Sequence, residues 1–196
     1  WTPYNETTHT GGDRHLGAHG RAVADTYELT RALDPTRPVN DCSGYIHVRT
    51  DIQSVHDYEQ DPVVFAERYG SVDSKNPEAA YTRFPEISTP YAGEPYIVDE
   101  YGGTWWEERP EDGASGMDRV GSWGYGERPA GKEEVYERIA ALTAVLTGHT
   151  QMAGFCYTQL TDVEQERNGL YTYDRKAKFD TERLRKIFGG TGRPAG

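Results

Sequence analysis

The chain has 196 residues, with 32 Asp and Glu against 21 Lys and Arg, and its formal charge at pH 7 is −11. This length suits one sizeable domain, because domains usually contain about 100 to 200 residues. The acidic balance argues against a nucleic-acid partner, since a protein that binds the phosphate backbone needs a basic surface. No apolar run approaches the roughly 18 residues of a membrane span, so we expect no membrane partner.

Cysteine and aromatic content give two further expectations. Cys42 and Cys156 are the only cysteines, and each falls inside a predicted strand. We expect buried free thiols rather than a disulfide framework, which favours a reducing, cytoplasmic compartment. The 14 Tyr and 4 Trp are amphipathic rings that suit stacking on sugars, although ordinary half-buried packing accounts for most such rings.

The first half of the chain alternates apolar runs with helix signals. The expected elements are a strand ending at 5–6, a helix over 16–33, strands over 38–43 and 51–55, and a helix over 62–69. Asp34-Pro35 ends the first helix, because a residue before proline avoids the helical region. Asp61 before Pro62 is a typical helix start, in which the aspartate caps the first turn.

The second half continues the alternation after a long polar connection. The expected elements are a strand over 95–100, a loop over 101–131, a helix over 132–147, a strand over 152–160, a loop over 161–178 and a last helix capped by Asp180 or Thr181. Strands that alternate with helices predict an α/β fold with a parallel sheet.

Two glutamates stand at predicted strand ends. Glu6 follows Asn5, and Glu100 ends the apolar run before Tyr-Gly-Gly. In a parallel barrel the carboxyl ends of all strands open on one face, so residues far apart in sequence meet there. Such a pair suits glycoside hydrolysis: a separation of about 5 to 5.5 Å indicates retention of configuration, and about 6.5 to 9.5 Å indicates inversion. The sequence leaves both outcomes open.

Four motifs in a fixed order resemble glycoside hydrolase family 2, which contains β-galactosidases and β-glucuronidases. They are Asn5-Glu6, the run at 34–39, Asp-Glu-Tyr-Gly at 99–102, and Asn-Gly-Leu-Tyr-Thr-Tyr-Asp-Arg-Lys at 168–176. The resemblance implies a partial (β/α)8 TIM barrel, about strands four to eight, in one domain over 1–196. The first three strands and the modules before the barrel would lie upstream in a longer protein. It also implies a retaining mechanism, with Glu6 as acid/base and Glu100 as nucleophile.

The same resemblance implies substrate-binding roles for further residues. Asn5 would bind the sugar 2-hydroxyl, and His56 and Tyr58 would lie beside the nucleophile. Thr158 stands where the family has a tryptophan platform, so Gln159 or a loop tryptophan such as Trp105 would serve instead, although packing beneath the loop is an equal alternative for Trp105.

The substrate expected from these motifs is a neutral sugar. Where glucuronidases carry the Asn-x-Lys motif that binds the substrate carboxylate, this chain has Glu166-Arg167-Asn168. A carboxylate at that position would repel a uronic acid. We therefore expect a β-galactosidase-like enzyme that needs no cofactor.

Two alternatives stay open. The chain could be a catalytically inert barrel fragment or carbohydrate-binding remnant that self-associates into a homo-oligomer through its open sheet edges. It could also be a metal-dependent hydrolase that uses the cluster of His9, Asp13, His15 and His19. We expect no metal, because Leu16 stands where the zinc-protease motif places a glutamate after its first histidine.

Overall fold

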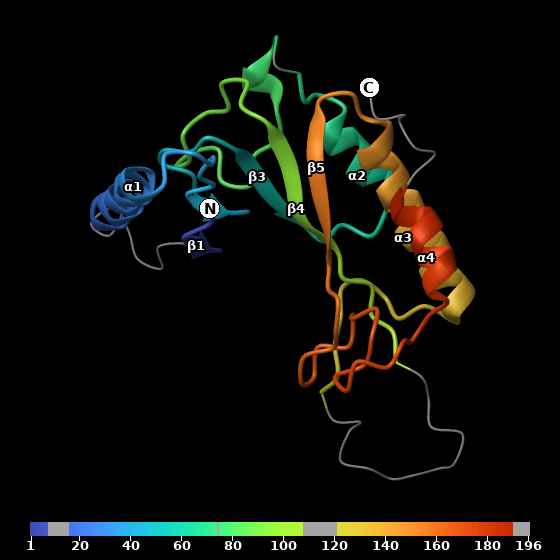
Figure 1. Ribbon diagram of the computed structural model, residues 1–196. Coiled ribbons are helices and arrows are strands. Elements are labelled where there is room, and N and C mark those ends of the chain that lie inside the picture. Colours follow the sequence, from blue (N-terminus) through green and yellow to red (C-terminus); the bar gives the residue numbers. More distant parts are fainter. Residues whose placement is uncertain (8–15, 74, 108–120, 190–196) are drawn as a thin grey trace. The chain divides into compact units, whose positions relative to one another are not determined.

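The computed structural model describes residues 1–7, 16–73, 75–107 and 121–189 as an α/β protein with parallel sheets (Figure 1). In chain order the elements are β1 (Tyr4–Asn5), α1 (Leu16–Leu33), β2 (Cys42–Ser43), β3 (Gln53–Asp57), α2 (Pro62–Tyr69), the 3₁₀ helix η1 (Pro77–Ala79), β4 (Tyr96–Gly102), α3 (Lys132–Gly148), β5 (Met152–Thr158) and α4 (Thr181–Gly189). The predicted order of strands and helices is confirmed, and η1 is an addition in the connection before β4.

The strands form two sheets. β1 and β2 make a parallel pair in which Tyr4 lies opposite Cys42 and Asn5 opposite Ser43. The other sheet has the order β3-β4-β5. The strand expected over 38–43 is reduced to its last two residues, and β4 continues two residues beyond Glu100, to Gly102. Glu100 is therefore inside its strand.

Two compact units are distinguished by their internal contacts. The first contains residues 1–57, 67–100 and 149–156, and the second contains 58–66, 101–148 and the chain from 157 onward. The boundary falls within α2, β4 and β5, so neither unit is a continuous stretch of sequence. The single domain expected from the sequence stays a prediction.

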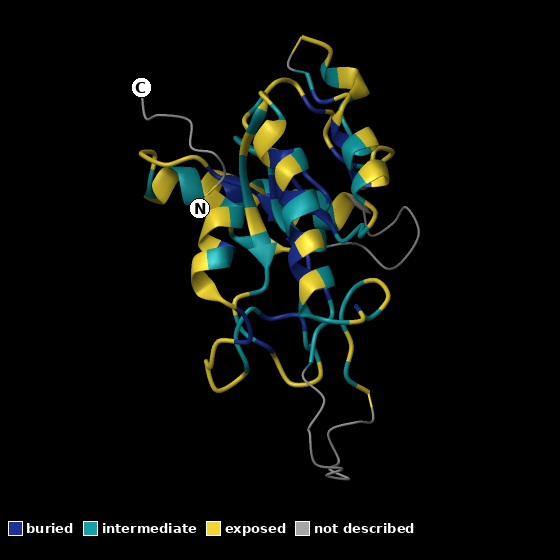
Figure 2. Ribbon diagram, turned by 90° about the vertical axis from the view of Figure 1, so that its right-hand side faces the viewer, coloured by how far each residue is buried: buried dark blue, intermediate teal, exposed yellow. Residues whose placement is uncertain are grey.

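The core of the first unit lies along β3 and β4. All five residues of β3 are buried, and Val55, Tyr96 and Val98 are among the most deeply buried apolar side chains. Figure 2 colours the ribbon by burial, with the buried residues in dark blue. Asp57 at the end of β3 accepts hydrogen bonds from Arg68 Nη1 at 2.5 Å and from the Tyr69 hydroxyl at 3.0 Å. These bonds provide hydrogen-bond donors for the buried Asp57 carboxylate. They also fix the end of β3, next to the candidate site residue His56.

The second unit is built around α3 and α4. Its apolar cluster contains Val135, Tyr136, Ile139, Phe179 and Leu184. The N-terminus of α4 is capped as predicted, because Asp180 Oδ1 accepts the backbone N–H groups of residues 182 and 183 at 2.9 and 3.0 Å.

Burial differs along α1 and between the two cysteines. Val23 and Tyr27 of α1 are buried, whereas Leu29 and Leu33 are 58% and 78% exposed. Cys42 is a buried free thiol as predicted, but the free thiol of Cys156 is exposed. A strand has two faces, and the sequence does not say which face of β5 is covered.

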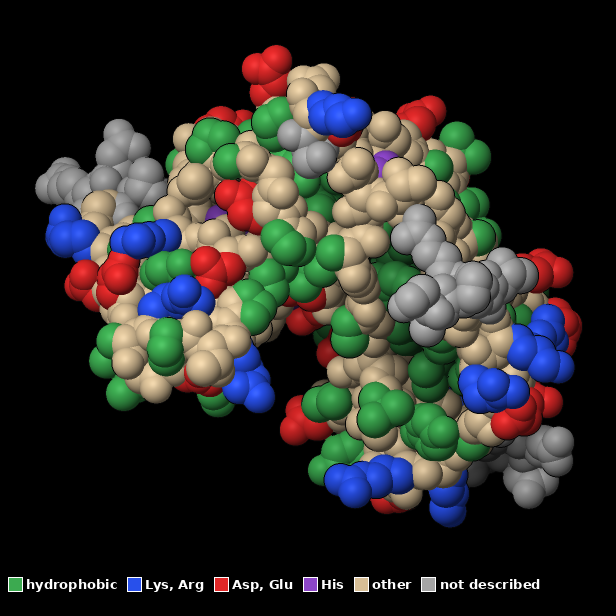
Figure 3. Space-filling view, turned by 45° about the horizontal axis from the view of Figure 1, so that its top comes forward, with side chains coloured by type: hydrophobic (Ala, Val, Ile, Leu, Met, Phe, Trp, Pro, Cys, Tyr) green, Lys and Arg blue, Asp and Glu red, His purple; other side chains and the backbone are tan. Residues whose placement is uncertain are grey.

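The surface and the helices show how the charged and apolar residues are distributed. Figure 3 shows Asp and Glu side chains interspersed with Lys and Arg on the visible face. Among the helices in the part of the chain that the structure describes, none is both long enough and apolar enough to cross a membrane.

Candidate active site

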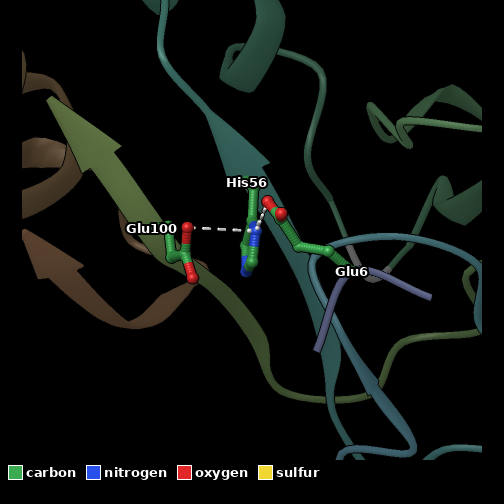
Figure 4. A group of neighbouring side chains, drawn as sticks. All are labelled: Glu6, His56 and Glu100. Atoms are coloured by element: carbon green, nitrogen blue, oxygen red, sulfur yellow. Dashed lines mark hydrogen bonds and ion pairs between the residues drawn. The ribbon is translucent and has the colours of Figure 1, made fainter. Parts of the chain in front are cut away.

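Glu6, His56 and Glu100 gather in the first unit, from three separate elements (Figure 4). Glu6 follows β1, His56 is in β3 and Glu100 is in β4. His56 Nδ1 lies 2.6 Å from Glu6 Oε1 and 3.3 Å from Glu100 Oε2. The imidazole is buried, with 1% of its side chain exposed, whereas the two carboxylates are 36% and 26% exposed.

The backbone around β2 positions two of these side chains. The Glu6 N–H donates to the Ser43 carbonyl at 3.1 Å, which extends the β1-β2 pairing by one residue. Glu6 has a φ of +50°, an unusual value for a residue with a side chain, as the chain turns away from β1. The His56 N–H donates to the Gly44 carbonyl at 3.4 Å. This bond holds the histidine against the end of β2, where the two glutamates contact it.

Gly44 makes room for the His56 ring. It has a φ of +75°, and a Cβ atom there would lie only 1.9 Å from Cδ2 of His56. Only glycine allows both this backbone conformation and this close approach of the ring.

A network of hydrogen bonds holds the other side of the imidazole. Ser43 Oγ lies 2.9 Å from His56 Nε2 and donates to Asp99 Oδ2 at 2.7 Å. Asn40 Nδ2 donates to the same Asp99 oxygen at 3.0 Å and to Ser54 Oγ at 3.1 Å. The ring orientation is therefore fixed by polar partners on both of its nitrogens.

The network also fixes where the imidazole carries hydrogen. Because Ser43 gives its hydroxyl hydrogen to Asp99, its oxygen accepts from His56, and Nε2 is a donor. The 2.6 Å contact between His56 Nδ1 and Glu6 Oε1 needs one more hydrogen. On Oε1 that hydrogen makes Glu6 a neutral acid, and on Nδ1 it makes an imidazolium between two carboxylates. The cluster thus shares one exchangeable proton.

The two glutamates are close to each other at the imidazole. One oxygen of Glu6, one nitrogen of His56 and one oxygen of Glu100 all lie within 4.8 Å of one another. A short separation of two carboxyl groups, about 5 to 5.5 Å, is typical of retaining glycosidases, whereas inverting ones have about 6.5 to 9.5 Å.

The structure describes the surroundings of two other residues expected at the site, Asn5 and Tyr58. Asn5 precedes Glu6 and is exposed on β1. Tyr58, in the second unit, stacks on Tyr125 with ring centroids 3.6 Å apart and donates to Thr158 Oγ1 at 3.5 Å. The place of Tyr58 beside the nucleophile stays a prediction.

Gln159 and Trp105 are also described within the second unit. Gln159 Nε2 donates to Asn168 Oδ1 at 2.8 Å, which ties the end of β5 to the loop that contains the 168–176 motif. The guanidinium of Arg128 lies 5.4 Å from the Trp105 ring centroid. Their roles in substrate binding stay predictions.

Two groups could be considered as metal ligands. In the cluster suggested by the sequence, His9, Asp13 and His15 lie outside the described residues, and His19 Nε2 lies 3.0 Å from the Thr7 hydroxyl. In the described part of the chain, Glu6, His56 and Glu100 have a spacing that could hold a metal ion.

Sequence reasoning missed the residues that support His56. Ser43, Asp99 and Asn40 are buried or partly buried polar side chains that reach it from two other segments. One residue in the sequence indicated this network: Asp99 directly precedes Glu100 at the predicted strand end. A second carboxylate at that position needs hydrogen-bond partners of its own.

Comparisons with known proteins identify the fold. No protein-family model matches the chain, and no curated protein matches its sequence. Among solved structures, it is similar to a Bifidobacterium dentium β-glucuronidase complexed with coumarin-3-O-glucuronide, with a TM-score of 0.62, 20% identity, and coverage of 97% of this chain and 30% of that chain. It is also similar to a GH2 β-galacturonidase from Eisenbergiella tayi bound to glycerol, with a TM-score of 0.60, 13% identity, and coverage of 89% and 31%.

A third similar structure is a β-glucuronidase from an uncultured Clostridium species, with a TM-score of 0.60, 15% identity, and coverage of 96% and 31%. The chain therefore spans less than a third of the length of these three proteins. At such identities the similarity concerns the fold alone: the chain has the fold of part of these glycoside hydrolases.

Proposed function

We propose that this chain is the catalytic region of a retaining β-glycosidase, formed by about strands four to eight of a TIM barrel, that hydrolyses terminal neutral β-linked sugars. The observation that carries the proposal is the approach of Glu6 and Glu100, whose ligand atoms lie within 4.8 Å of each other and of His56. Two carboxylates at this spacing are the minimum apparatus for double displacement at an anomeric carbon.

The chemistry assigns a different role to each carboxylate. Ionised Glu100 attacks the anomeric carbon and forms a glycosyl ester while Glu6 gives its proton to the departing oxygen. Glu6, now ionised, then takes a proton from water, and the hydroxide so formed attacks the ester. The sugar leaves with its configuration retained, and Glu100 is free again.

His56 supports the first step by its place between the two carboxylates. The proton that it shares with Glu6 is the one that the departing oxygen needs, and moving it from Nδ1 to Oε1 keeps Glu6 protonated without exchange with solvent. Ser43 and Asp99 hold the ring in the tautomer that allows this transfer.

A neutral sugar is proposed because of the loop at 166–168, which the family resemblance relates to binding of a substrate carboxylate. Glu166 carries a negative charge there and accepts a hydrogen bond from Asn168 Nδ2 at 2.9 Å. Arg167 between them lies 3.8 Å from the carboxylates of Glu107 and Asp162, so its charge is already balanced. Because the similar solved proteins are named for uronic acids, the assay includes a β-glucuronide as the contrasting substrate.

The test is hydrolysis of aryl β-galactosides, β-glucosides and β-glucuronides by the 196-residue chain and two variants. We expect Glu100→Gln to lower turnover about 10³-fold or more, because the nucleophile is lost. Glu6→Gln should cost about 10²- to 10⁴-fold with alkyl glycosides and far less with nitrophenyl glycosides, whose departing oxygen needs little protonation.

The matched control is Glu86→Gln, at an exposed position of the same unit. Near-normal turnover by Glu100→Gln would refute the assignment. An inert wild-type chain that elutes as a dimer would favour the alternative of a self-associating fragment. That alternative is considered because the chain covers only about 30% of the similar solved proteins. Preference for the glucuronide would refute the neutral substrate.

A further inference from the structure

We propose that Glu6, His56 and Glu100 also form a zinc-binding site, and that zinc bound there reversibly inhibits the enzyme. The ligand set consists of one imidazole nitrogen and one oxygen from each carboxylate, all within 4.8 Å of one another (Figure 4). Zinc binds such nitrogen and oxygen donors with bonds of about 2.0 to 2.2 Å, which places tetrahedral ligands about 3.4 Å apart.

The distances require movements of about 1.4 Å at most, because the three ligand atoms lie within 4.8 Å of one another and tetrahedral ligands lie about 3.4 Å apart. His56 Nδ1 and Glu100 Oε2 are 3.3 Å apart, which already suits tetrahedral ligands. The 2.6 Å contact of His56 Nδ1 with Glu6 Oε1 must open by less than about 1 Å. Both glutamates are partly exposed and can rotate, whereas the buried His56 ring is held against Gly44 and provides a rigid donor.

The partners of His56 Nε2 have the arrangement found behind metal-bound histidines. Nε2 donates to Ser43 Oγ, which in turn donates to Asp99, so the lone pair of the neutral ring is on Nδ1, facing the glutamates. A hydrogen-bonded partner on the far nitrogen fixes the tautomer and raises the basicity of the ligating nitrogen. Zinc would replace the single proton shared with Glu6.

Charge also favours a divalent cation. The ring is surrounded by the carboxylates of Glu6, Glu100 and Asp99, and Arg83 donates to the His56 backbone oxygen at 3.3 Å. One nitrogen and two carboxylates suit zinc better than magnesium or calcium, which require six or more oxygen ligands including water.

The inhibitory effect rests on the proposed function, whereas the binding itself does not. Zinc held by both carboxylates would block the attack by Glu100 and the proton transfer from Glu6, and it would occupy the place of the anomeric carbon. Inhibition should therefore be competitive with the glycoside and reversed by a chelator.

Binding is tested by calorimetric titration of the chelator-treated 196-residue chain with zinc chloride at pH 7. We expect His56→Asn to weaken zinc binding at least tenfold at the strongest site. Glu100→Gln, at a partly exposed position, is the second variant and guards against misfolding of the first. Cobalt added in place of zinc should give the visible absorption of a tetrahedral site in the wild type and not in either variant.

The control variants are His19→Asn, from the histidine cluster near the start of the chain, and His149→Asn, whose Nδ1 accepts from the Gln151 N–H at 3.2 Å. Both should bind zinc as the wild type does. Equal affinity of the wild type, His56→Asn and Glu100→Gln would overturn the site, and so would loss of binding in His19→Asn alone. If zinc bound tightly at His56 but did not inhibit a measurable glycosidase activity, the inhibitory role would be overturned. If the chain bound zinc at His56 but had no glycosidase activity, the zinc site would be established and the proposed function would fail.

Discussion

Substitution of Gly44 by alanine tests how closely the candidate site depends on the position of His56. The new Cβ would lie 1.9 Å from His56 Cδ2, 2.1 Å from Cγ and 2.4 Å from Nε2. Ordinary contact begins at 3.4 Å, so the ring must move by about 1.5 Å, the difference between 3.4 and 1.9 Å. A shift of this size breaks hydrogen bonds of 2.6 Å to Glu6 and 2.9 Å to Ser43.

The expected loss follows from these contacts. The positive φ of Gly44 costs alanine about 1 to 2 kcal/mol, and each broken buried hydrogen bond costs about 1 to 3 kcal/mol. With both hydrogen bonds broken the total is at least about 3 kcal/mol, about 1 for the backbone and about 1 for each bond. A loss of about 3 kcal/mol lowers Tm by about 6 to 12 °C in a chain of this length, and a larger loss lowers it further. A misplacement of about 1 Å in a catalytic group lowers kcat/KM about 10²-fold.

The assay is thermal unfolding together with hydrolysis of an aryl β-glycoside. The matched control is Gly121→Ala, because Gly121 also has a positive φ, of 104°, but has nothing within 4 Å of the added Cβ. This control should lose only the backbone contribution to stability and should keep its activity within about threefold. If Gly44→Ala matched Gly121→Ala in both Tm and kcat/KM, the role given to the His56 position would be refuted.

Two further predictions concern stability and thiol reactivity. Asp162→Asn should lower the free energy of unfolding by about 3 to 5 kcal/mol, because it leaves the buried Lys178 ammonium, 2.8 Å away, without its partner charge. Glu182→Gln, in an exposed ion pair, should change it by less than about 0.5 kcal/mol, and equal effects in thermal melts would contradict this reasoning. Burial raises the thiol pKa of Cys42, and partial desolvation together with the negative charges of Asp99 and Glu100 raises that of Cys156, so alkylation should be slow at pH 7 and accelerate as pH rises. Mass spectrometry after brief iodoacetamide treatment should find label on exposed Cys156 well before buried Cys42, and the reverse order would contradict the burial described for them.

Local signals in the sequence predicted the helices well. The bounds of α1 and α2 agree with expectation, because proline and capping aspartates act within a few residues of each helix end. Asp61 Oδ1 accepts the N–H of Val63 at 2.8 Å, as its place before Pro62 indicated. The strands were less well predicted: β2 keeps two residues of the stretch over 38–43, because a strand depends on its neighbours more than on its own residues.

The candidate site was predictable in part. Glu6, His56 and Glu100 were expected near one another, and the structure brings these three together. The contact of His56 with Gly44 and Ser43 was not predictable, because it depends on how β2 and β3 approach each other. Periodicity within one strand contains no information on that approach.

The burial of the two cysteines illustrates the same limit. Both lie in strands as predicted, yet Cys42 is buried and Cys156 is exposed. Alternation along a strand assigns residues to two faces, and the packing of other elements decides which face is covered.

The role of Glu100 as nucleophile is tested most directly by trapping the covalent intermediate. The fluorine of a 2-deoxy-2-fluoro β-glycoside slows both the formation and the hydrolysis of the glycosyl ester. A good leaving group restores the rate of formation, so the intermediate accumulates. Mass spectrometry of the digested chain should then find the fluorosugar on the peptide that contains Glu100, and Glu100→Gln should remain unlabelled. A sugar attached to another residue, or turnover that releases product of inverted anomeric configuration, would contradict the account.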